Sequence, residues 1–292
     1  ERVDRDLPQL AQRHPQLQLH ALNVHGTILS DQGNIAAADV YEQRAWTLAQ
    51  ALPDTSDAQR DQLELDLAQS QDRLGQLAAG EATLRDLIAR QTGRLGPRHP
   101  QTLYSQALLA SNLVLQKRMD EAASLIAPAV GGLTASLGAQ ARRTLLAQGV
   151  QASIALVQRR FQDASAIYGQ VVAGLTQAYG PRSPSSIVAL ENQAIATQFG
   201  IGADAAEPLF RSALRKARAL FKEDNPRVQH LRFALADCLL TAHRKTGEAV
   251  ALLAGLDPHI LDGADREPNW DGRLYYENGR ALLLRGRPRE AL

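Results

Sequence analysis

The residues able to bind metals or attack a substrate are few in this 292-residue chain and lie far apart in the sequence. His20 and His25 are close together, but five positions of a helix turn the chain by about 500°, so their rings leave on different faces. Cys238 stands in the apolar stretch FALADCLL, where a small buried residue is a better interpretation than a nucleophile. The seven histidines are His14, His20, His25, His99, His230, His243 and His259.

Sequence motifs that carry chemistry are also missing. The chain contains no GxxxxGK[ST] phosphate loop, GxGxxG turn, HExxH zinc motif, GxSxG nucleophile elbow, CxxC pair or kinase catalytic loop. Its acidic residues are scattered, which is typical of solvated faces. We therefore predict no catalytic residue, no metal site and no cofactor in this chain.

Composition limits the classes of partner. The net charge is +1 with 22% charged residues, which is too balanced for a nucleic-acid-binding surface. Apolar residues make up 45% but aromatic ones only 4%, so Leu, Ala, Val and Ile build the core, a mixture that suits helices. No run of about 18 apolar residues is present, so we expect no membrane insertion by this fragment. The chain begins without Met and stops part-way through a repeated pattern, and we interpret it as a fragment of a longer protein.

A recurring break in the helical pattern organises the chain. The motif LGPRHPQTL begins at Leu95, and related segments begin at Leu137, Tyr179 and Phe221, each 42 residues after the last. Gly and Pro do not continue a helix, so each break separates two copies of one unit. We predict a single repeat domain with approximate boundaries 11–52, 53–94, 95–136, 137–178, 179–220, 221–262 and an incomplete 263–292.

Two small residues keep the same phase in every copy, 12 or 13 positions apart. Where two helices cross closely, only Gly or Ala lets the axes approach. Each copy is therefore predicted to be a helix hairpin, with a first helix (A), a short turn and a second helix (B). The first set of small residues is Gly26, Ala68, Ala110, Ala152, Ala194, Ala236 and Gly279. The second set is Ala38, Gly80, Ala122, Ala164, Ala206, Ala249 and Ala291.

Proline positions agree with this arrangement. Pro100, Pro184 and Pro226 lie at helix starts, where a missing N–H is harmless. Pro128 and Pro208 fall inside predicted B helices, and Pro128 is expected to kink its helix. The predicted A and B helices are 15–31 with 34–51, 58–75 with 77–92, 101–116 with 119–135, 143–158 with 161–178, 185–199 with 203–221, 227–242 with 246–256, and 270–284 with 287 onward.

This pattern resembles the tetratricopeptide repeat (TPR), a helix pair with small residues near the middle of helix A and early in helix B. The usual TPR period is about 34 residues. The longer period and the loop LGPxHPxTL resemble the repeats of kinesin light chain. The loop is clear in the third repeat, fair in the fifth and eroded elsewhere. The resemblance implies an all-α fold, a right-handed superhelical solenoid of about seven helix-turn-helix repeats whose A helices line a concave groove.

A second resemblance concerns the N-terminal segment ERVDRDLPQLAQRHPQLQLHALNVHGTILSDQGN. It is similar to the start of the repeat region in certain bacterial membrane-anchored regulators. In those proteins a cytoplasmic Ser/Thr kinase domain, or a winged-helix DNA-binding domain, precedes one transmembrane helix, and the repeats lie outside the inner membrane. The resemblance implies a periplasmic domain tethered through a segment outside this sequence, with a cytoplasmic location as the alternative.

The groove residues implied by the TPR resemblance fall a few positions on either side of the small residue of helix A. They form a mixed groove with an apolar middle. The groove lacks the Lys/Asn/Arg set with which some of these repeats clamp a terminal carboxylate, so a chaperone C-terminus is not the expected ligand. The candidates are His20, Asn23, Thr27, Gln69, Asp72, Tyr104, Ser111, Ser153, Glu191, Asn192, Gln198, His230, Phe233, Asp237, Tyr276 and Arg280.

Several functions stay open at this point. The first is a scaffold that binds a peptide or protein partner in the groove, in its specific form the sensory repeat domain of a bacterial membrane-anchored Ser/Thr kinase. The second is self-association as a homodimer that brings attached output domains together. The extracytoplasmic domain of a winged-helix regulator and a cytoplasmic TPR adaptor are further alternatives. An enzyme would need clustered polar groups in a closed pocket, and the sequence shows none.

Overall fold

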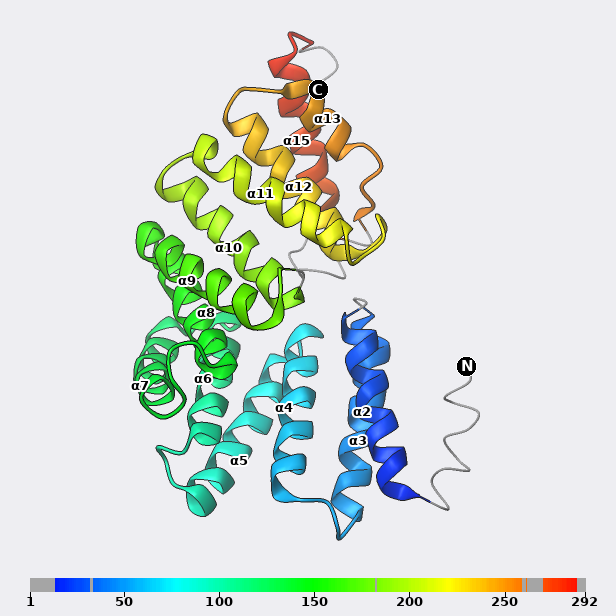
Figure 1. Cartoon of the computed structure of the whole chain (residues 1–292). Helices are drawn as coiled ribbons and strands as arrows, with labels where there is room; N and C mark the ends of the chain where they lie inside the picture. The colour runs from blue at the N-terminus through cyan, green and yellow to red at the C-terminus, as the bar shows by residue number, and fades with distance from the viewer. Residues whose placement is uncertain (1–13, 32–33, 182, 259–260, 262–269, 288–292) are drawn as a thin grey trace. The chain divides into compact units, whose positions relative to one another are not determined.

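The computed structural model describes residues 14–31, 34–181, 183–258, 261 and 270–287, which form helices and turns without a β-strand (Figure 1). The chain divides into two compact units, residues 1–138 and 139–292. The described helices of the first unit are α2 (Pro15–Asp31), α3 (Ile35–Ala51), α4 (Asp57–Arg73), α5 (Leu77–Leu95), α6 (Pro100–Leu115) and α7 (Met119–Leu137). Those of the second are α8 (Arg142–Val157), α9 (Phe161–Tyr179), α10 (Pro184–Gly200), α11 (Ala203–Arg218), α12 (Pro226–Thr241), α13 (Thr246–Leu253) and α15 (Trp270–Leu284).

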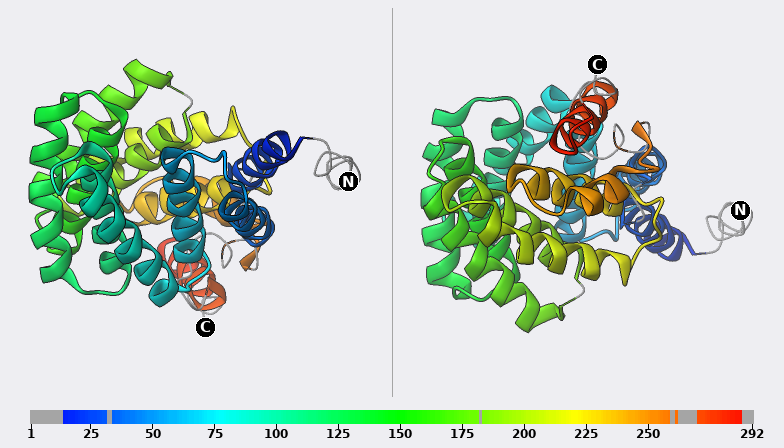
Figure 2. Two further views of the ribbon diagram at one scale, coloured as in Figure 1. Left: turned by 90° about the horizontal axis from the view of Figure 1, so that it is seen from below. Right: turned by 90° about the horizontal axis from the view of Figure 1, so that it is seen from above.

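Each unit is a stack of helix hairpins. Helix A packs on the B helix that follows it, as α6 does on α7 and α8 on α9, and each B helix packs on the next A helix of its unit (Figures 1 and 2). Successive A helices also touch one another, namely α4 with α6, α8 with α10, and α12 with α15. The A helices therefore line the inner side of each stack. The predicted all-α, TPR-like solenoid class is confirmed.

The predicted helices agree with the observed ones to within three residues at every described end. The largest differences are at B-helix ends. The sixth B helix, predicted to reach residue 256, stops at Leu253 because Ala254 is extended and Gly255 has a φ of +71°. Helix α7 continues through Pro128 as one helix from Met119 to Leu137. The B helix predicted from residue 287 and its small residue Ala291 lie outside the described residues.

The recurring break has a glycine that ends a B helix. Gly96, Gly138 and Gly180 have φ values of +92°, +87° and +83°, a left-handed conformation that residues with a side chain rarely adopt. The N–H of each glycine still bonds to the carbonyl four residues earlier, so the helix closes before the chain turns away. The 42-residue spacing of these three glycines in the sequence is therefore the spacing of B-helix ends.

The same break starts the next A helix three residues later. His99 caps α6, because its Nδ1 accepts from the backbone N–H of Gln101 at 3.3 Å. Ser183 and Asn225 occupy the equivalent positions and cap α10 and α12 through their side-chain oxygens. A proline follows each of the three capping residues at the first helical position, as predicted.

Both sets of small residues lie at closed helix crossings. Every alanine of the two sets within the described residues is fully buried, and Gly26 and Gly80 are buried as well. Ala152 and Ala164 face one cluster with Tyr168 and Leu175 in the second unit. The late Gly279 is only half-buried. The phase read from the sequence therefore marks real contacts between helices A and B.

A larger side chain at one helix crossing tests whether the small residues have been assigned to the correct positions. Ala152→Leu adds three carbons where no side-chain surface is exposed, so we expect a loss of roughly 1–3 kcal/mol in the free energy of unfolding. Ala173→Leu, on the exposed side of α9, is the matched control and should change stability by less than about 0.5 kcal/mol. Urea unfolding followed by circular dichroism measures both. Equal effects of the two variants would show that the phase is misassigned.

Candidate partner-binding surface

In the first unit, three predicted groove residues lie on α2. His20 and Thr27 are exposed, and Asn23 is half-buried. The Thr27 hydroxyl donates to the carbonyl oxygen of Asn23 at 3.0 Å, a bond within its own helix. This bond joins two predicted groove residues, but it stays within α2 and reaches no neighbouring helix. The three residues are solvated positions on the face of a helix.

Most of the predicted groove residues of α4 and α6 contact their own or a neighbouring helix. Asp72 accepts a hydrogen bond from Asn112 Nδ2 of α6 at 2.5 Å, so it joins two A helices. Gln69 donates to the backbone of its own helix, at the carbonyl of Leu65. Tyr104 is buried and Ser111 is half-buried. In the first unit the polar positions of the inner face are therefore mainly structural.

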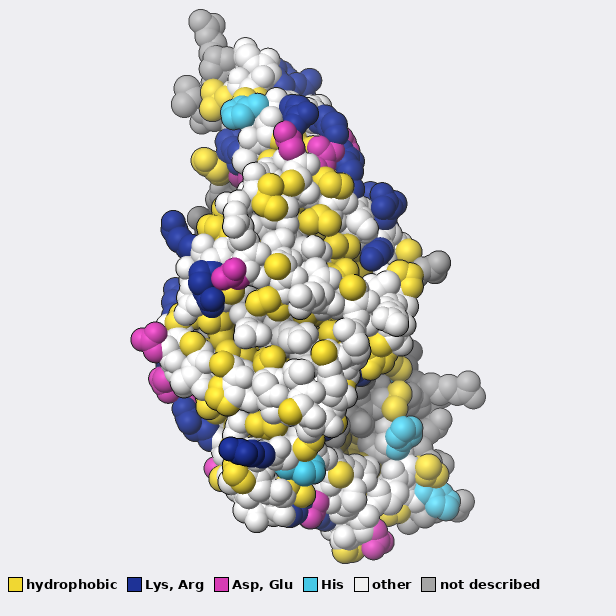
Figure 3. Space-filling model, turned by 60° about the vertical axis from the view of Figure 1, so that its left-hand side comes forward, with side chains coloured by type: hydrophobic (Ala, Val, Ile, Leu, Met, Phe, Trp, Pro, Cys, Tyr) yellow, Lys and Arg dark blue, Asp and Glu magenta, His cyan; other side chains and the backbone are white. Residues whose placement is uncertain are grey.

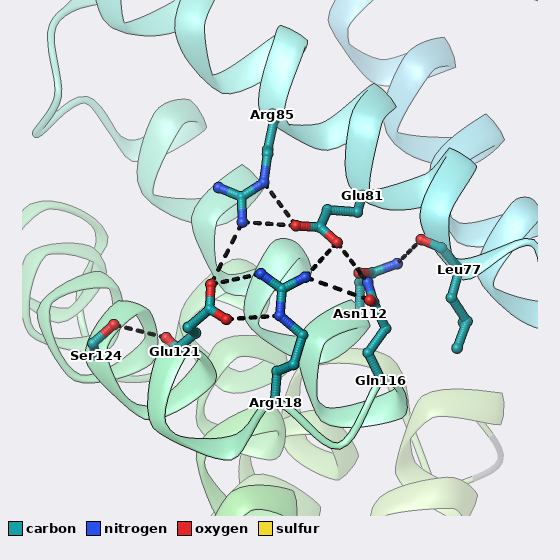
Figure 4. Close-up of polar contacts among 8 residues, drawn as sticks. All are labelled: Leu77, Glu81, Arg85, Asn112, Gln116, Arg118, Glu121 and Ser124. Atoms are coloured by element: carbon teal, nitrogen blue, oxygen red, sulfur yellow. Dashed lines mark hydrogen bonds and ion pairs between the residues drawn. The ribbon is translucent and has the colours of Figure 1, made fainter.

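A polar clamp joins the second and third repeats in the first unit, and Figure 4 shows its members. Glu81 of α5 accepts from Gln116 Nε2 at 2.8 Å, from Arg118 Nη1 at 2.6 Å and from Arg85 Nε at 2.8 Å. Arg118 also donates to both carboxylate oxygens of Glu121, each at 2.7 Å. The hydrogen bond from Gln116, followed by the two guanidinium groups, holds the pKa of Glu81 below its usual value.

The second unit contains the same clamp three repeats later. Glu207 of α11 accepts from Arg211 at 2.8 Å and also pairs with Lys245. Arg211 in turn donates to both oxygens of Glu248, each at 2.7 Å. The hydrogen bonds from Lys245 and then Arg211 lower the pKa of Glu207. An acid early in helix B, a cation four residues later and a cation in the next A–B turn thus form a recurring junction between repeats.

On the inner side of the second unit, Glu191 of α10 is 2% exposed and meets two groups of α12. Its Oε2 accepts from Arg227 Nη1 at 2.9 Å, and its Oε1 lies against His230 Nδ1. Both Glu191 and His230 are predicted groove residues, and the structure brings them together. Burying a carboxylate is unfavourable without such partners, so this cluster fixes the spacing of α10 and α12.

A second cluster continues along the same inner side. Asp237 of α12 accepts from Gln198 Nε2 of α10 at 2.9 Å and from Arg280 Nη1 of α15 at 2.8 Å. Arg280 also bonds to Glu277, whose pKa is raised by burial and by the nearby charge of Asp237. The Arg280 guanidinium lies 5.7 Å from the ring centre of the exposed Tyr276. Four predicted residues thus form one connected network across three A helices.

Phe233 occupies the same repeat position as Glu191, one repeat later. It is buried, and the Arg273 guanidinium of α15 lies 5.0 Å from its ring centre. The side chain at this position therefore reaches the next A helix in both repeats. That contact uses Phe233 for packing between repeats.

One repeat earlier, this position is Gly149 and the contact is absent. Apart from its chain neighbours and its own helix backbone, no atom lies within 4 Å of a Cβ atom added to Gly149, so the space that Glu191 and Phe233 fill in the next two repeats is open beside α8. Ser153, one turn further along α8, donates to the Gly149 carbonyl at 3.1 Å. This open position on the inner side of α8, which we call the hollow at Gly149, is the place of a missing side chain, and the charged clusters lie further along the unit at α10, α12 and α15.

Hydroxyl and amide groups stand beside this hollow. Tyr168 of α9 is buried, and its phenol oxygen lies 2.6 Å from Ser153 Oγ and is also hydrogen-bonded to Asn192 of α10. Burial raises the pKa of Tyr168 to about 12, so the phenol is neutral at physiological pH. Ser153 and Asn192 were predicted groove residues, and the structure joins them through a B-helix tyrosine. From Thr144 to its end at Val157, α8 carries no charged side chain.

The absence of charged side chains does not by itself distinguish the inner side of α8, because α9, the outer helix of the same hairpin, is also largely uncharged. Helix α9 has no charged side chain from Ala164 to Tyr179. Figure 3 shows a face on which hydrophobic and other uncharged side chains cover most of the surface and charged ones are sparse. The hollow at Gly149 and its hydrogen-bonding rim distinguish the inner side.

The sequence did not single out Tyr168, Arg227 or Glu277. Tyr168 stands at a B-helix position that is Leu84, Ile126 and Phe210 in other repeats, so only its added hydroxyl sets it apart. A column-by-column comparison of the repeats would have revealed that hydroxyl. Arg227 and Glu277 follow no such pattern and became visible only through their partners.

The remaining reactive residue is inert. Cys238 is fully buried, its Sγ lies 3.3 Å from the Ala203 carbonyl, and burial raises the pKa of the thiol to about 12. It is a core residue, in agreement with the sequence. Within the part of the chain that the structure describes, no three His, Cys, Asp or Glu residues form a group able to hold a metal ion.

No protein-family model matches this chain, and no curated protein matches it. Solved structures do. A protein from Podosopora anserina, described as a kinesin light chain with nearly identical TPR-like repeats, matches with a TM-score of 0.56 and 22% identity, over 71% of this chain and 97% of that one. The quorum sensor NprR from B. thuringiensis, in its apo form, matches with a TM-score of 0.65 and 13% identity, over 99% of this chain and 78% of its own.

A Rap protein complexed with Competence and Sporulation Factor matches with a TM-score of 0.64 and 12% identity, over 99% of this chain and 81% of its own. At these levels of identity the likeness concerns the fold. The chain has the TPR fold, including the form found in kinesin-light-chain-like repeats.

A double-mutant cycle tests whether the inner network joins the A helices. The side chains of Arg280 and Asp237 are 25% and 32% exposed, so we expect a coupling energy of about 0.5–1 kcal/mol between Arg280→Ala and Asp237→Ala. Arg244 and Asp204 form a matched pair with exposed fractions of 59% and 68%, and should couple by less than about 0.3 kcal/mol. Urea unfolding measures both cycles. A coupling near zero for the first pair would mean that the network does not stabilise the stack.

Proposed function

We propose that this chain is a protein-interaction scaffold that holds a peptide or an extended protein segment on the inner side of its A helices. The observation that carries the proposal is the hollow at Gly149 in the second unit, bordered by the hydroxyl and amide groups of Ser153, Tyr168 and Asn192. Small uncharged polar groups beside an open position suit a neutral peptide stretch, whose backbone offers donors and acceptors at short intervals.

The neighbouring clusters make this surface rigid before a partner arrives. Glu191 and Asp237 each bridge neighbouring A helices through side chains that are already paired. A surface that is ordered in advance loses less conformational entropy on binding, so a shallow set of contacts can give useful affinity. Because these charged groups are paired with one another, they limit where a charged ligand side chain can bind.

In its specific form, the proposal is that the chain is the sensory repeat domain of a bacterial membrane-anchored Ser/Thr kinase. Two matching folds belong to proteins described as a quorum sensor and as a Rap protein bound to a Competence and Sporulation Factor, which supports a role in signal recognition. The resemblance of the N-terminal segment to membrane-anchored regulators supports the tethered arrangement and a periplasmic location. Among the described helices, none has the length and apolar character needed to cross a bilayer.

Peptide selection with matched glycine variants tests the scaffold function. Random 12-residue peptides displayed on phage are panned against the purified chain, and the enriched peptide is synthesised for fluorescence anisotropy. Gly149→Leu fills the hollow and should weaken binding at least about tenfold, or 1.4 kcal/mol. Gly131→Leu is the control, because a side chain at this position of the outer helix α7 also meets open space.

Both variants replace a helical glycine, so neither should lower the thermal midpoint. Loss of binding in Gly149→Leu alone would support the site. Equal affinity in both variants, or no enriched peptide, would contradict it.

The compartment has its own test. In spheroplasts that express the full-length protein, added protease should remove the repeat domain and leave a cytoplasmic control protein intact. Detection uses an antibody against residues 100–250. Protection of the domain until the membrane is lysed would place it in the cytoplasm and contradict the tethered periplasmic arrangement.

A further inference from the structure

Glu42 stands at a position that every other described repeat fills with a large apolar or aromatic side chain. The equivalent positions, four residues after the small residue of each B helix, are Leu84, Ile126, Tyr168, Phe210 and Leu253, all of them buried. Glu42 is equally buried, with 6% of its surface exposed. A carboxyl group thus replaces a core side chain at the junction of α2, α3 and α4. Such a replacement is unfavourable unless the acid is neutral or paired.

The surroundings of Glu42 leave oxygens without partners. Glu42 Oε2, Asp39 Oδ1 and Ser70 Oγ are all buried and have no hydrogen-bond partner that meets ordinary geometry. Asp39 is 7% exposed and Ser70 is fully buried. These three residues face one another across the α3–α4 contact, where the Ser70 hydroxyl lowers the pKa of both carboxyl groups against the larger effect of burial. Buried polar atoms are rarely left unsatisfied.

Packing around Glu42 is tight on the side of α2. A Cβ atom added to Gly26 would lie 3.0 Å from Glu42 Cγ, so the backbone of α2 rests against the acid's own side chain. His25, the titratable neighbour on α2, packs its ring against Tyr41 at a centroid distance of 4.4 Å. The carboxyl group therefore cannot reach solvent by a small movement of its own side chain.

The junction also lacks the cations of the equivalent junctions. Asp39 corresponds to Glu81 and Glu207, which have Arg85 and Arg211 four residues later. Here the residue four positions later is Gln43, which donates to Asp39 Oδ2 at 2.6 Å but brings no charge.

On α4, Arg73 attracts the Glu42 carboxylate and Asp66 repels it. The guanidinium of Arg73 bonds to Ser30 of α2 and forms no ion pair with Glu42. No full positive charge therefore balances the two buried acids.

We propose that the junction of α2 and α3 with α4 is a proton-operated joint, which is closed when Glu42 carries a proton and loosens when the proton leaves. A proton provides the missing donor that the unpaired carboxyl and hydroxyl oxygens require. The junction is not a candidate site for a metal ion, because no three His, Cys, Asp or Glu residues of the described part of the chain come together as ligands.

The direction of the pH response follows from burial. Burial raises the pKa of Glu42 from its ordinary 4.5 to about 6, and it also raises the pKa of Asp39. Because the pKa is higher in the closed joint than in the open one, the closed form is fully favoured below about pH 4.5. That stabilisation is lost as the pH rises through about 6, the value in the closed joint. The α2–α3 hairpin should therefore open more often at neutral pH than at acidic pH.

Hydrogen exchange of the purified chain tests this joint without any partner, so its result is independent of the proposed peptide binding. Amide exchange in α2 and α3 is measured at several values between about pH 4 and pH 8 and corrected for the intrinsic exchange rate. The opening constant of this hairpin should rise up to about 30-fold across the range, because that factor corresponds to a pKa of 4.5 in the open joint and about 6 in the closed one. Amides of α8 and α9, which carry no charged side chain over residues 144–157 and 164–179, serve as the internal reference and should show no such rise.

Variants identify the group responsible. Glu42→Gln removes the titration of this group and should abolish most of the pH dependence of the opening constant, with a smaller part left to Asp39. Asp86→Asn, at an exposed acid of α5, is the control and should keep the full response. Glu42→Leu restores the side chain of the equivalent repeat positions, and should likewise remove most of the pH response even if Glu42→Gln folds poorly. An undiminished pH response in Glu42→Leu, or the absence of a response from the unmodified chain, would overturn the proposal.

Discussion

The close crossing of two helices at a pair of small residues is the constraint on which each repeat depends. At Ala152 and Ala164, as at the equivalent pairs, no side-chain surface remains exposed. A larger residue there would force the helix axes apart, and the large apolar side chains on either side would lose contact with their partners. The hairpin therefore has one packing distance, and stacking such hairpins gives a regular framework with a defined inner side.

Polar side chains then set how one hairpin meets the next. The junctions around Glu81 and Glu207 use the same arrangement of an acid with two cations, one in its own helix and one in the next A–B turn. On the inner side, Glu191 and Asp237 each bridge neighbouring A helices. Each of these pairs is partly shielded from water, so its contribution depends on geometry more than on the number of charges.

At two positions a residue differs in kind from the equivalent residues of other repeats, and each difference supports one of the functional proposals. Gly149 removes a side chain that reaches the next A helix elsewhere, and it leaves a hollow beside Ser153, Tyr168 and Asn192. Glu42 does the opposite, because it places a charge-bearing group where other repeats place an apolar one. The first departure creates room for a ligand, and the second makes packing depend on a proton. A repeat protein shows such departures clearly, since each position has several internal references.

The sequence by itself determined the helices, their breaks and the phase of the crossings. Glycine and proline determine the conformation of the local backbone, and small residues at a fixed period determine how closely the nearest helix packs. Both effects can therefore be predicted from the order of residues along the chain. Only the tertiary structure decided what the predicted groove residues do. Glu191 and Phe233 are buried against the next A helix, Asp72 joins α4 to α6, and Ser153 meets Asn192 through Tyr168. These outcomes depend on contacts between residues up to about 40 positions apart, and a count along one helix cannot tell whether a side chain will face water or a neighbouring helix.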